Sequence, residues 1–225
     1  MPRTRLTLAL GFAIALAGAP VAAQDHGHID KVHGSITAKS SQSYGDLETV
    51  NGSIKIGDNA RVADAETVNG SISVGERSQT GGLETVNGSI RVGSNVTASA
   101  GLETVNGGIF VDRGGNVRGD IETVNGAIGL VDTDVTGGIE TVNGDVTVGV
   151  GSHVAGGIRY TKPNGIGIKL KPRNPRVVIG PNARVDGPLV FEREVVLYVH
   201  ATAKTGPITG ATAKRFDTAT APDHD

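Results

Sequence analysis

The chain has 225 residues and a nearly balanced charge, with 21 Lys and Arg against 23 Asp and Glu. This balance argues against a partner that is a nucleic acid or an anionic membrane. Cysteine is absent, which excludes disulfides and a lipid-modified cysteine, so stability must come from packing and backbone hydrogen bonds. With 34 glycines, no Trp and 3% aromatic residues, a core of large aromatic side chains is not expected.

Residues 1–23 have the pattern of a secretory signal peptide. Arg3 and Arg5 precede a short apolar run at 6–20, and small residues follow at 21–23. The run is shorter than the about 20 residues that span a bilayer, so we expect removal and no transmembrane segment afterwards. Removal leaves 19 basic against 23 acidic residues, a net charge of −4. We expect export to the periplasm or the cell surface.

An eight-residue motif, LETVNGSI at residues 47–54, recurs along the chain in steps of 18 or 19 residues. A degenerate copy, IDKVHGSI, begins at Ile29, and a weaker copy begins at Ile158. A fixed period of this length is typical of repeat architectures. The six clear copies begin at Leu47, Ala65, Leu83, Leu102, Ile121 and Ile139.

Each copy holds the same residue types at the same offsets. An apolar residue is followed by Glu, Thr, Val and the pair Asn-Gly, and two more apolar residues follow, two positions apart. That alternation has the period of a β-strand, and β-branched residues dominate the periodic positions. No stretch after residue 23 shows a helical pattern, so we predict an all-β protein.

Two folds compete for this pattern. Asn-Gly between short alternating segments favours a two-residue turn, so six antiparallel hairpins are one interpretation. A β-solenoid with one coil per repeat is the other, and we favour it because parallel coils stack identical residues about 4.8 Å apart. The predicted fold is a three-sided, single-stranded parallel β-helix with 18–19-residue coils. The general preference for right-handed crossovers favours a right-handed helix.

Stacked coils would align equivalent side chains into columns. The Asn column would form a ladder of amide hydrogen bonds, and the following glycines, Gly52 to Gly144, would supply the backbone freedom of a sharp corner. The Glu column is Glu48, Glu66, Glu84, Glu103, Glu122 and Glu140. The Thr column is Thr49, Thr67, Thr85, Thr104, Thr123 and Thr141. The Asn column is Asn51, Asn69, Asn87, Asn106, Asn125 and Asn143.

The six-residue spacing of Val50, Ile56 and Val62 predicts that one of them points inward from each side of the first full coil. Thr80 and Ala98 are weaker matches at the third of these positions in later coils. About nine coils are expected between Ile29 and Phe191, each rising about 4.8 Å.

The sequence also predicts how the chain is divided. We expect a flexible leader at 24–28, solenoid repeats at 29–188, terminal coils and a cap at 189–216, and a disordered tail at 217–225. Within the repeats, residues 162–176 combine three prolines with several basic residues and indicate an irregular loop or a distorted coil.

The glycine-cornered coils resemble the polymer-forming bactofilin type of β-helix, in particular through IGPNARVDGPLVFEREVVLYVHATAKTGPITGATAKRF at residues 179–216. The chain also resembles exported bacterial proteins that are grouped loosely with adhesins of unknown function. The resemblance covers most of residues 29–216. It implies a right-handed, three-sided helix that assembles end to end without a nucleotide. The signal peptide departs from typical bactofilins, which are chiefly cytoplasmic.

The Glu column is the strongest chemical feature. Like charges about 4.8 Å apart would repel by about 1 kcal/mol per neighbour in water before screening. Such a stripe is a candidate site for Ca²⁺ or for a cationic polymer, because hard cations bind carboxylate oxygens. The interpretation we favour is a solvated face that prevents lateral association of sheets.

Two weaker features invite binding hypotheses. The Thr column resembles the arrays of ice-binding solenoids, although strand propensity explains a single column beside Glu. His26, His28 and His33 lie close to Asp25 and Asp30 in the sequence and offer metal-ligand types. A flexible histidine-containing leader is the explanation we favour.

No residue is assigned to catalysis, to a cofactor or to a metal. His153 and His200 are isolated, and coils that differ by one residue leave no room for the loops that build active sites on enzymatic solenoids. We expect a non-enzymatic, structural or adhesin-like solenoid that presents repetitive faces to a cell-envelope polymer or protein. One alternative is a bactofilin-like envelope scaffold that polymerises end to end through its terminal coils, and another is a cation-binding envelope protein that uses the Glu column.

Overall fold

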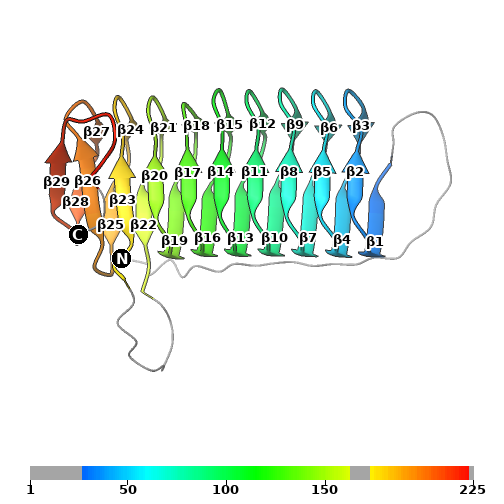
Figure 1. The fold of residues 1–225 in the computed structure, drawn as a ribbon, viewed down its shortest axis with the longest axis horizontal. Helices are drawn as coiled ribbons and strands as arrows, with labels where there is room; N and C mark the ends of the chain where they lie inside the picture. The colour runs from blue at the N-terminus through cyan, green and yellow to red at the C-terminus, as the bar shows by residue number, and fades with distance from the viewer. Residues whose placement is uncertain (1–26, 163–172, 223–225) are drawn as a thin grey trace.

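The computed structural model describes residues 27–162 and 173–222. Figure 1 shows these residues wound into an elongated prism, with successive coils side by side along its long axis. The predicted signal peptide lies outside the described residues, as do parts of the leader, the basic loop and the tail. The described residues contain no helix long and apolar enough to cross a membrane.

Three parallel sheets form the sides of the prism, and each full coil contributes one strand to each sheet. The Glu sheet, which carries the Glu column, consists of β1 (Ile29–His33), β4 (Leu47–Asn51), β7 (Ala65–Asn69), β10 (Leu83–Asn87), β13 (Leu102–Asn106), β16 (Ile121–Asn125), β19 (Ile139–Asn143), β22 (Ile158–Tyr160), β25 (Leu189–Phe191) and β28 (Ile208–Thr209). The second sheet consists of β2 (Ile36–Ala38), β5 (Ile54–Ile56), β8 (Ile72–Val74), β11 (Ile90–Val92), β14 (Ile109–Val111), β17 (Ile128–Leu130), β20 (Val146–Val148), β23 (Arg176–Ile179), β26 (Val196–His200) and β29 (Ala213–Phe216). The third sheet consists of β3 (Ser43–Tyr44), β6 (Arg61–Val62), β9 (Gln79–Thr80), β12 (Thr97–Ala98), β15 (Asn116–Val117), β18 (Asp134–Val135), β21 (His153–Val154), β24 (Arg184–Val185) and β27 (Lys204–Thr205).

The pairing confirms the solenoid and overturns the hairpin alternative. Each strand pairs in parallel with the strand one coil away, so that Leu83 lies opposite Ala65 on one side and Leu102 on the other. The Asn-Gly pairs therefore join strands of different sheets. Nine strands of the Glu sheet lie between Ile29 and Phe191, as the repeat count predicted.

From β4 to β19, each five-residue strand of the Glu sheet turns two side chains into the interior. In β4 these are Leu47 and Thr49, whereas Val50 lies half-buried on the outer surface. The prediction that Val50 points inward is therefore wrong. The alternation of the strand begins at Leu47, so the residue in phase with it is Thr49. The six-residue spacing compares Val50 with Ile56 in the next strand, and the alternation of inward and outward side chains is not kept through the corner between them.

The other two sheets complete one continuous apolar core. Ile54 and Ile56 are buried in the second sheet, and Val62 is buried in the third, as expected. Thr80 and Ala98 are also buried and occupy the third-sheet position in the next two coils. Small and medium side chains fill a narrow prism, which explains a core that needs few aromatic residues.

The Thr column is buried, and all its hydroxyls except that of Thr141 are hydrogen-bonded. The Oγ1 of Thr85 donates to the carbonyl oxygen of Gly70 in the preceding coil over 2.8 Å. Thr49, Thr67, Thr104 and Thr123 make the same bond over 2.8–3.1 Å. A surface threonine array of the ice-binding type is therefore excluded, because these hydroxyls face the interior.

The Asn column forms the predicted amide ladder. In each step, Nδ2 of one asparagine donates to Oδ1 of the asparagine in the preceding coil over 3.0–3.1 Å. The last step ends on Arg193, whose Nη1 donates to Oδ1 of Asn143 and, over 2.8 Å, to the carbonyl oxygen of Val142. A charged donor thus terminates the ladder at its C-terminal end.

The glycines that follow the Asn column allow the backbones of successive coils to approach closely. A Cβ built on Gly88 would overlap the carbonyl oxygen of Gly70, and the same overlap recurs along the column. Gly52 to Gly144 lie at the corner, as predicted, but none of these six glycines has a positive φ, and most of the described residues that do lie at another corner. Asn59 and Asn95, with φ near +57° and +58°, lie between the second and third sheets.

The basic insertion replaces one Asn-Gly corner. Strand β22 ends at Tyr160 and β23 begins at Arg176, and the side chain of Asp145 accepts the backbone N–H of Arg176 over 2.8 Å. Tyr160 takes the place of a threonine in the buried column, and its hydroxyl donates to the carbonyl oxygen of Gly144 over 2.7 Å. The regular stacking therefore continues past the insertion.

In the described part of the predicted tail, residues 217–220 are exposed, and Ala221 and Pro222 contact the outer surface of the second sheet. Ala221 packs on a small cluster that includes Val178 and Tyr198. Nη2 of Arg176 donates to the carbonyl oxygens of Ala221 and Pro222 over 3.1 and 2.7 Å, and its guanidinium lies 5.4 Å from the ring centroid of Tyr198.

The buried hydroxyls supply a matched pair for a stability test. Thr85→Val removes the bond to Gly70, so we expect a loss of about 1–2 kcal/mol in the free energy of unfolding. Thr141→Val should cost less than about 0.5 kcal/mol, because the hydroxyl of Thr141 is buried without a partner. Urea denaturation of both variants measures the difference. Equal losses would contradict the assigned role of the hydroxyl.

Candidate functional site

The Glu column runs along the outer surface of the Glu sheet in strict register. Glu48 pairs with Glu66, and the pairing continues with one glutamate per strand as far as Glu140. Each glutamate lies between two inward residues of its strand, so its carboxylate points outward next to a valine, which is half-buried in every strand except β19, where Val142 is buried. The surface is a column of carboxylates beside a column of β-branched apolar side chains.

The pKa values of the carboxylates in the Glu column are raised, so these groups ionise less readily than free glutamate. Burial and then the charges of Glu103, Glu66 and Asp64 raise the pKa of Glu84 to about 7. Burial followed by Glu103, Glu140 and Asp120 raises the pKa of Glu122 to about 7 as well. The pKa values of the other four glutamates are also raised, with burial as the largest cause. Part of the column therefore carries protons near neutral pH.

Positive charge reaches the column at its two ends. His28 lowers the pKa of Glu48 and Arg159 lowers that of Glu140, in each case against a larger effect of burial. Arg159 occupies the next register position after Glu140 and forms an ion pair with Glu192 over 3.7 Å. Between these ends, no cation of the described residues lowers the pKa of the four glutamates Glu66, Glu84, Glu103 and Glu122.

Aspartates at the corner beside the Glu sheet add to the negative field. The Oδ1 of Asp64 accepts the backbone N–H of Gly82, and the Oδ1 of Asp120 accepts that of Gly138, each over 2.6 Å in the next coil. These aspartates have a structural role as bridges between coils. Their charge also faces the column, because Asp64 and Asp120 raise the pKa of nearby glutamates.

A shallow hollow of about 320 Å³ lies at the C-terminal end of the column. Its lining includes the carboxylates of Asp120, Glu122 and Glu140, the guanidinium of Arg159 and the side chain of Val190. Oε1 of Glu140 is buried there without a hydrogen-bond partner. The hollow offers carboxylate acceptors together with the apolar side chain of Val190, which suits a cationic group on an aliphatic stem.

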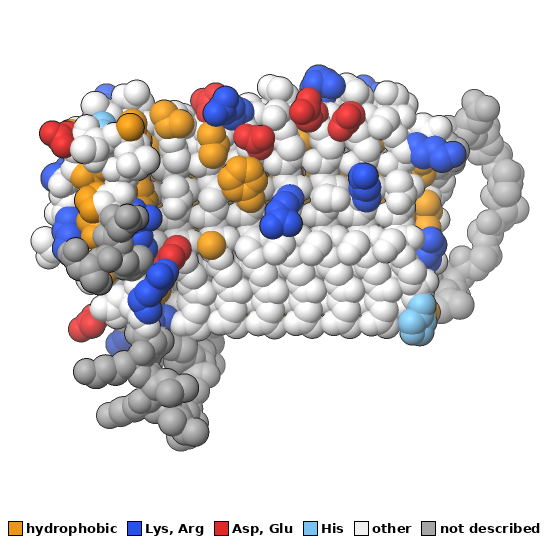
Figure 2. Space-filling view, in the orientation of Figure 1, with side chains coloured by type: hydrophobic (Ala, Val, Ile, Leu, Met, Phe, Trp, Pro, Cys, Tyr) orange, Lys and Arg blue, Asp and Glu red, His pale blue; other side chains and the backbone are white. Residues whose placement is uncertain are grey.

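The corner that follows the Glu sheet is uncharged over most of its length. Each coil contributes three residues to this corner. From 51–53 in the first clear copy to 125–127 in the fifth, these residues are Asn, Gly, Ser or Ala, and the first acidic residue is Asp145 in the sixth. Figure 2 shows a broad area of this kind, without charged or hydrophobic side chains, along the lower half of the prism. In this view, charged side chains of both signs lie over the upper half and toward the left end of the prism.

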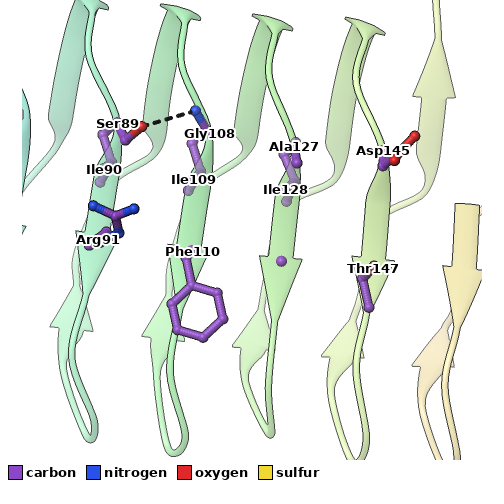
Figure 3. A pocket seen from close by; sticks show the side chains of 11 residues that line it. Ser89, Ile90, Arg91, Gly108, Ile109, Phe110, Ala127, Ile128, Asp145 and Thr147 are labelled. Atoms are coloured by element: carbon purple, nitrogen blue, oxygen red, sulfur yellow. Dashed lines mark hydrogen bonds between the residues drawn. The ribbon is translucent and has the colours of Figure 1, made fainter. Parts of the chain in front are cut away.

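A second hollow, of about 230 Å³, lies on the second sheet (Figure 3). Arg91, Phe110 and Thr147 project from β11, β14 and β20, with Gly129 of β17 between Phe110 and Thr147. Because Gly129 has no side chain to cover the neighbouring ring, Phe110 is 42% exposed. No prediction from the sequence identified this feature, because its lining residues come from four repeats that differ at the outward positions of the second sheet.

The structure separates the histidines that the sequence grouped together. His28 lies beside Asp30, Asp46 and Glu48, whereas His33 pairs across strands with Asn51. His26 and Asp25 lie outside the described residues.

The two histidines that looked isolated in the sequence both have partners. His153 lies 2.9 Å from Asp186 and 3.8 Å from Asp134, which belong to neighbouring coils of the third sheet. Nδ1 of His200 lies 2.9 Å from the hydroxyl of Thr202, and its ring packs edge-on against Phe216. The Asp186 contact spans 33 residues, so only knowledge of the length of the inserted coil would have revealed it.

Comparison with known proteins gives no match: no family model, curated protein or solved structure is significantly similar to the chain. The fold assignment therefore rests on the strand pairing, and the functional argument rests on the surfaces of the prism.

The raised pKa values predict how stability depends on pH. The folded pKa of Glu84 lies above that of the unfolded chain, so its contribution to stability is present in acid and is lost as the pH rises through about 7. Glu84→Gln should raise the free energy of unfolding at pH 8 by about 1 kcal/mol, a value reduced for solvent screening of a half-buried group. At pH 4 the variant and the wild type should agree.

The control for this prediction is Glu76→Gln. Glu76 is exposed and forms an ion pair with Arg77 over 2.9 Å, so its removal should not stabilise the protein at pH 8. Urea denaturation at both pH values provides the four comparisons. A gain for Glu84→Gln that is the same at pH 4 and pH 8 would show that the carboxylate charge is not its cause.

Proposed function

We propose that this chain is a non-catalytic, exported rod that uses the outer surface of the Glu sheet to bind a repetitive, positively charged partner. The observation that carries the proposal is the Glu column, in which six half-buried carboxylates stand in register and no cation of the described residues acts on the pKa values between its ends. Export is supported by the signal-peptide pattern at residues 1–23.

Coil stacking does not by itself require identical residues on an outward position. The equivalent outward column of the second sheet runs from Lys55 through Ser73 and Arg91 to Phe110, and these side chains share no chemistry. Identical glutamates on the Glu sheet therefore need a reason other than packing. Binding of cations supplies one, since it offsets the repulsion that the column otherwise incurs.

The neighbouring valines favour an organic cation over a bare metal ion along the middle of the column. A carboxylate such as Glu84 accepts hydrogen bonds from an ammonium or guanidinium group, while Val86 beside it offers an apolar surface to an aliphatic stem. A linear polymer with basic side groups would repeat this contact from coil to coil. Multivalent contacts of this kind give avidity from pairs that are individually weak.

The test uses a fluorescently labelled lysine oligomer as the probe, with binding followed by anisotropy at pH 8 and low salt. Relative to the wild type, Glu84→Gln/Glu122→Gln should weaken binding roughly tenfold, because it removes two of the six column charges. The control variant, Glu76→Gln/Asp134→Asn, removes two exposed charges from other sides of the prism. Equal weakening by both variants would reduce the effect to net charge and overturn the proposal.

A second candidate function, head-to-tail assembly into filaments, is favoured by the ends of the sheets. Strands β1 to β3 at one end and β27 to β29 at the other are terminal in their sheets among the described residues, as Figure 1 shows. Unpaired strand edges are templates for further pairing. Val32 on β1 is 55% exposed, although the equivalent valine of the next coil is half-buried.

Negative-stain electron microscopy of the full chain tests this second function. Assembly predicts filaments much longer than one rod, which is about 45 Å for ten coils. Val32→Lys should shorten them, whereas Val150→Lys, at a similarly exposed site in the turn after β20, should not. Uniform short rods of the wild type would rule out this function without affecting the Glu sheet as a binding surface.

A further inference from the structure

The N-terminal end of the Glu column differs chemically from the rest. Asp30 on β1 takes the column position and pairs in register with Glu48 on β4, so two carboxylates stand side by side. His28 lies immediately before β1, and its Nε2 lies 3.1 Å from Oδ1 of Asp30 and 3.8 Å from Oε1 of Glu48. One nitrogen and two oxygen ligands thus lie within 4.8 Å of one another.

The other ring nitrogen of His28 provides an independent indication of a metal site. Nδ1 lies 3.4 Å from Oδ2 of Asp46, on the side of the ring opposite the two column carboxylates. Asp46 is itself held in place, since its Oδ1 accepts the backbone N–H of Asp64 over 3.1 Å. A carboxylate on one imidazole nitrogen, with the second nitrogen directed at further ligands, is the arrangement that orients metal-binding histidines.

From this geometry we propose that His28, Asp30 and Glu48 bind one divalent transition metal ion of the Zn²⁺ class, and that Asp46 positions the His28 ring. A set of one imidazole nitrogen and two carboxylate oxygens suits Zn²⁺ better than Ca²⁺ or Mg²⁺, which prefer oxygen ligands alone. The side chains of His28 and Asp30 are 46% and 44% exposed, so water could reach a bound ion and would complete its coordination. The ion would relieve the repulsion between the two carboxylates.

His153 shows why the proposal is confined to His28. Each ring nitrogen of His153 faces one carboxylate, Asp186 on one side and Asp134 on the other. The Asp186 carboxylate is also bonded by Arg184, and these two hydrogen bonds hold its pKa below the usual value. An arginine that already neutralises a carboxylate competes with a metal, so His153 is a histidine in ion pairs and serves as the natural control.

The proposal does not depend on the binding of a cationic polymer to the middle of the column. Glu84 and Glu122, which carry that function, belong to coils beyond Glu66 and take no part in the His28 cluster. The Glu84→Gln/Glu122→Gln variant should therefore lose binding of the lysine oligomer and keep binding of Zn²⁺. The two ideas can fail separately.

Calorimetric titration of ZnCl₂ into the full chain, freed of metal with EDTA, tests the site. We expect one high-affinity ion per chain, affinity at least tenfold weaker in His28→Ala, and affinity 10- to 100-fold weaker in Asp46→Asn, the size of effect expected for a supporting carboxylate. His33→Ala and His153→Ala should bind like the wild type. CaCl₂ should not displace the Zn²⁺.

A thermal melt separates loss of the site from loss of the fold. In EDTA, His28→Ala and the wild type should melt together, because His28 is about half exposed, and added ZnCl₂ should raise the melting temperature of the wild type only. Absence of stoichiometric Zn²⁺ binding by the wild type would overturn the proposal. Equal binding by His28→Ala and the wild type would overturn it as well.

Discussion

The close approach of one coil to the next at the Asn-Gly corner is the constraint on which the rest of this structure depends. There the backbone of each glycine lies against the carbonyl of the glycine one coil earlier, with no room for a Cβ. This contact fixes the register, and the Asn ladder and the Thr hydroxyl bonds repeat because the register does. A slender prism with little core volume gains its stability from such repeated bonds as well as from packing.

Strict register also determines the electrostatics of the surface. A residue type that is repeated at an outward position must stack on itself, so the glutamates cannot be staggered away from one another. Their raised pKa values are the physical consequence of that stacking and of partial burial. The same register creates the His28 site, because it brings Asp30 beside Glu48 where the column meets a histidine. The proposed binding properties thus follow from the repeat itself.

Much of this architecture could be predicted from the repeat, and the errors have physical causes. Identical residues at a period of 18 or 19 predict parallel coils, the Asn ladder and the Glu column directly. The inward role of Thr85 was missed because a buried hydroxyl is acceptable only when a carbonyl faces it, as Gly70 does here. The contacts of His28 with Asp46 and of Arg193 with Asn143 join separate coils, and no local pattern encodes them.

The most direct test of this account compares two glycine substitutions by urea denaturation. Gly88→Ala should cost at least about 3 kcal/mol, because its Cβ would overlap the backbone of the preceding coil. Gly82→Ala should change stability by less than about 1 kcal/mol, since the nearest atom to its Cβ would be Oδ1 of Asp64 at 3.5 Å. Similar costs at the two positions would contradict the claim that coil-to-coil contact at the Asn-Gly corner governs the fold.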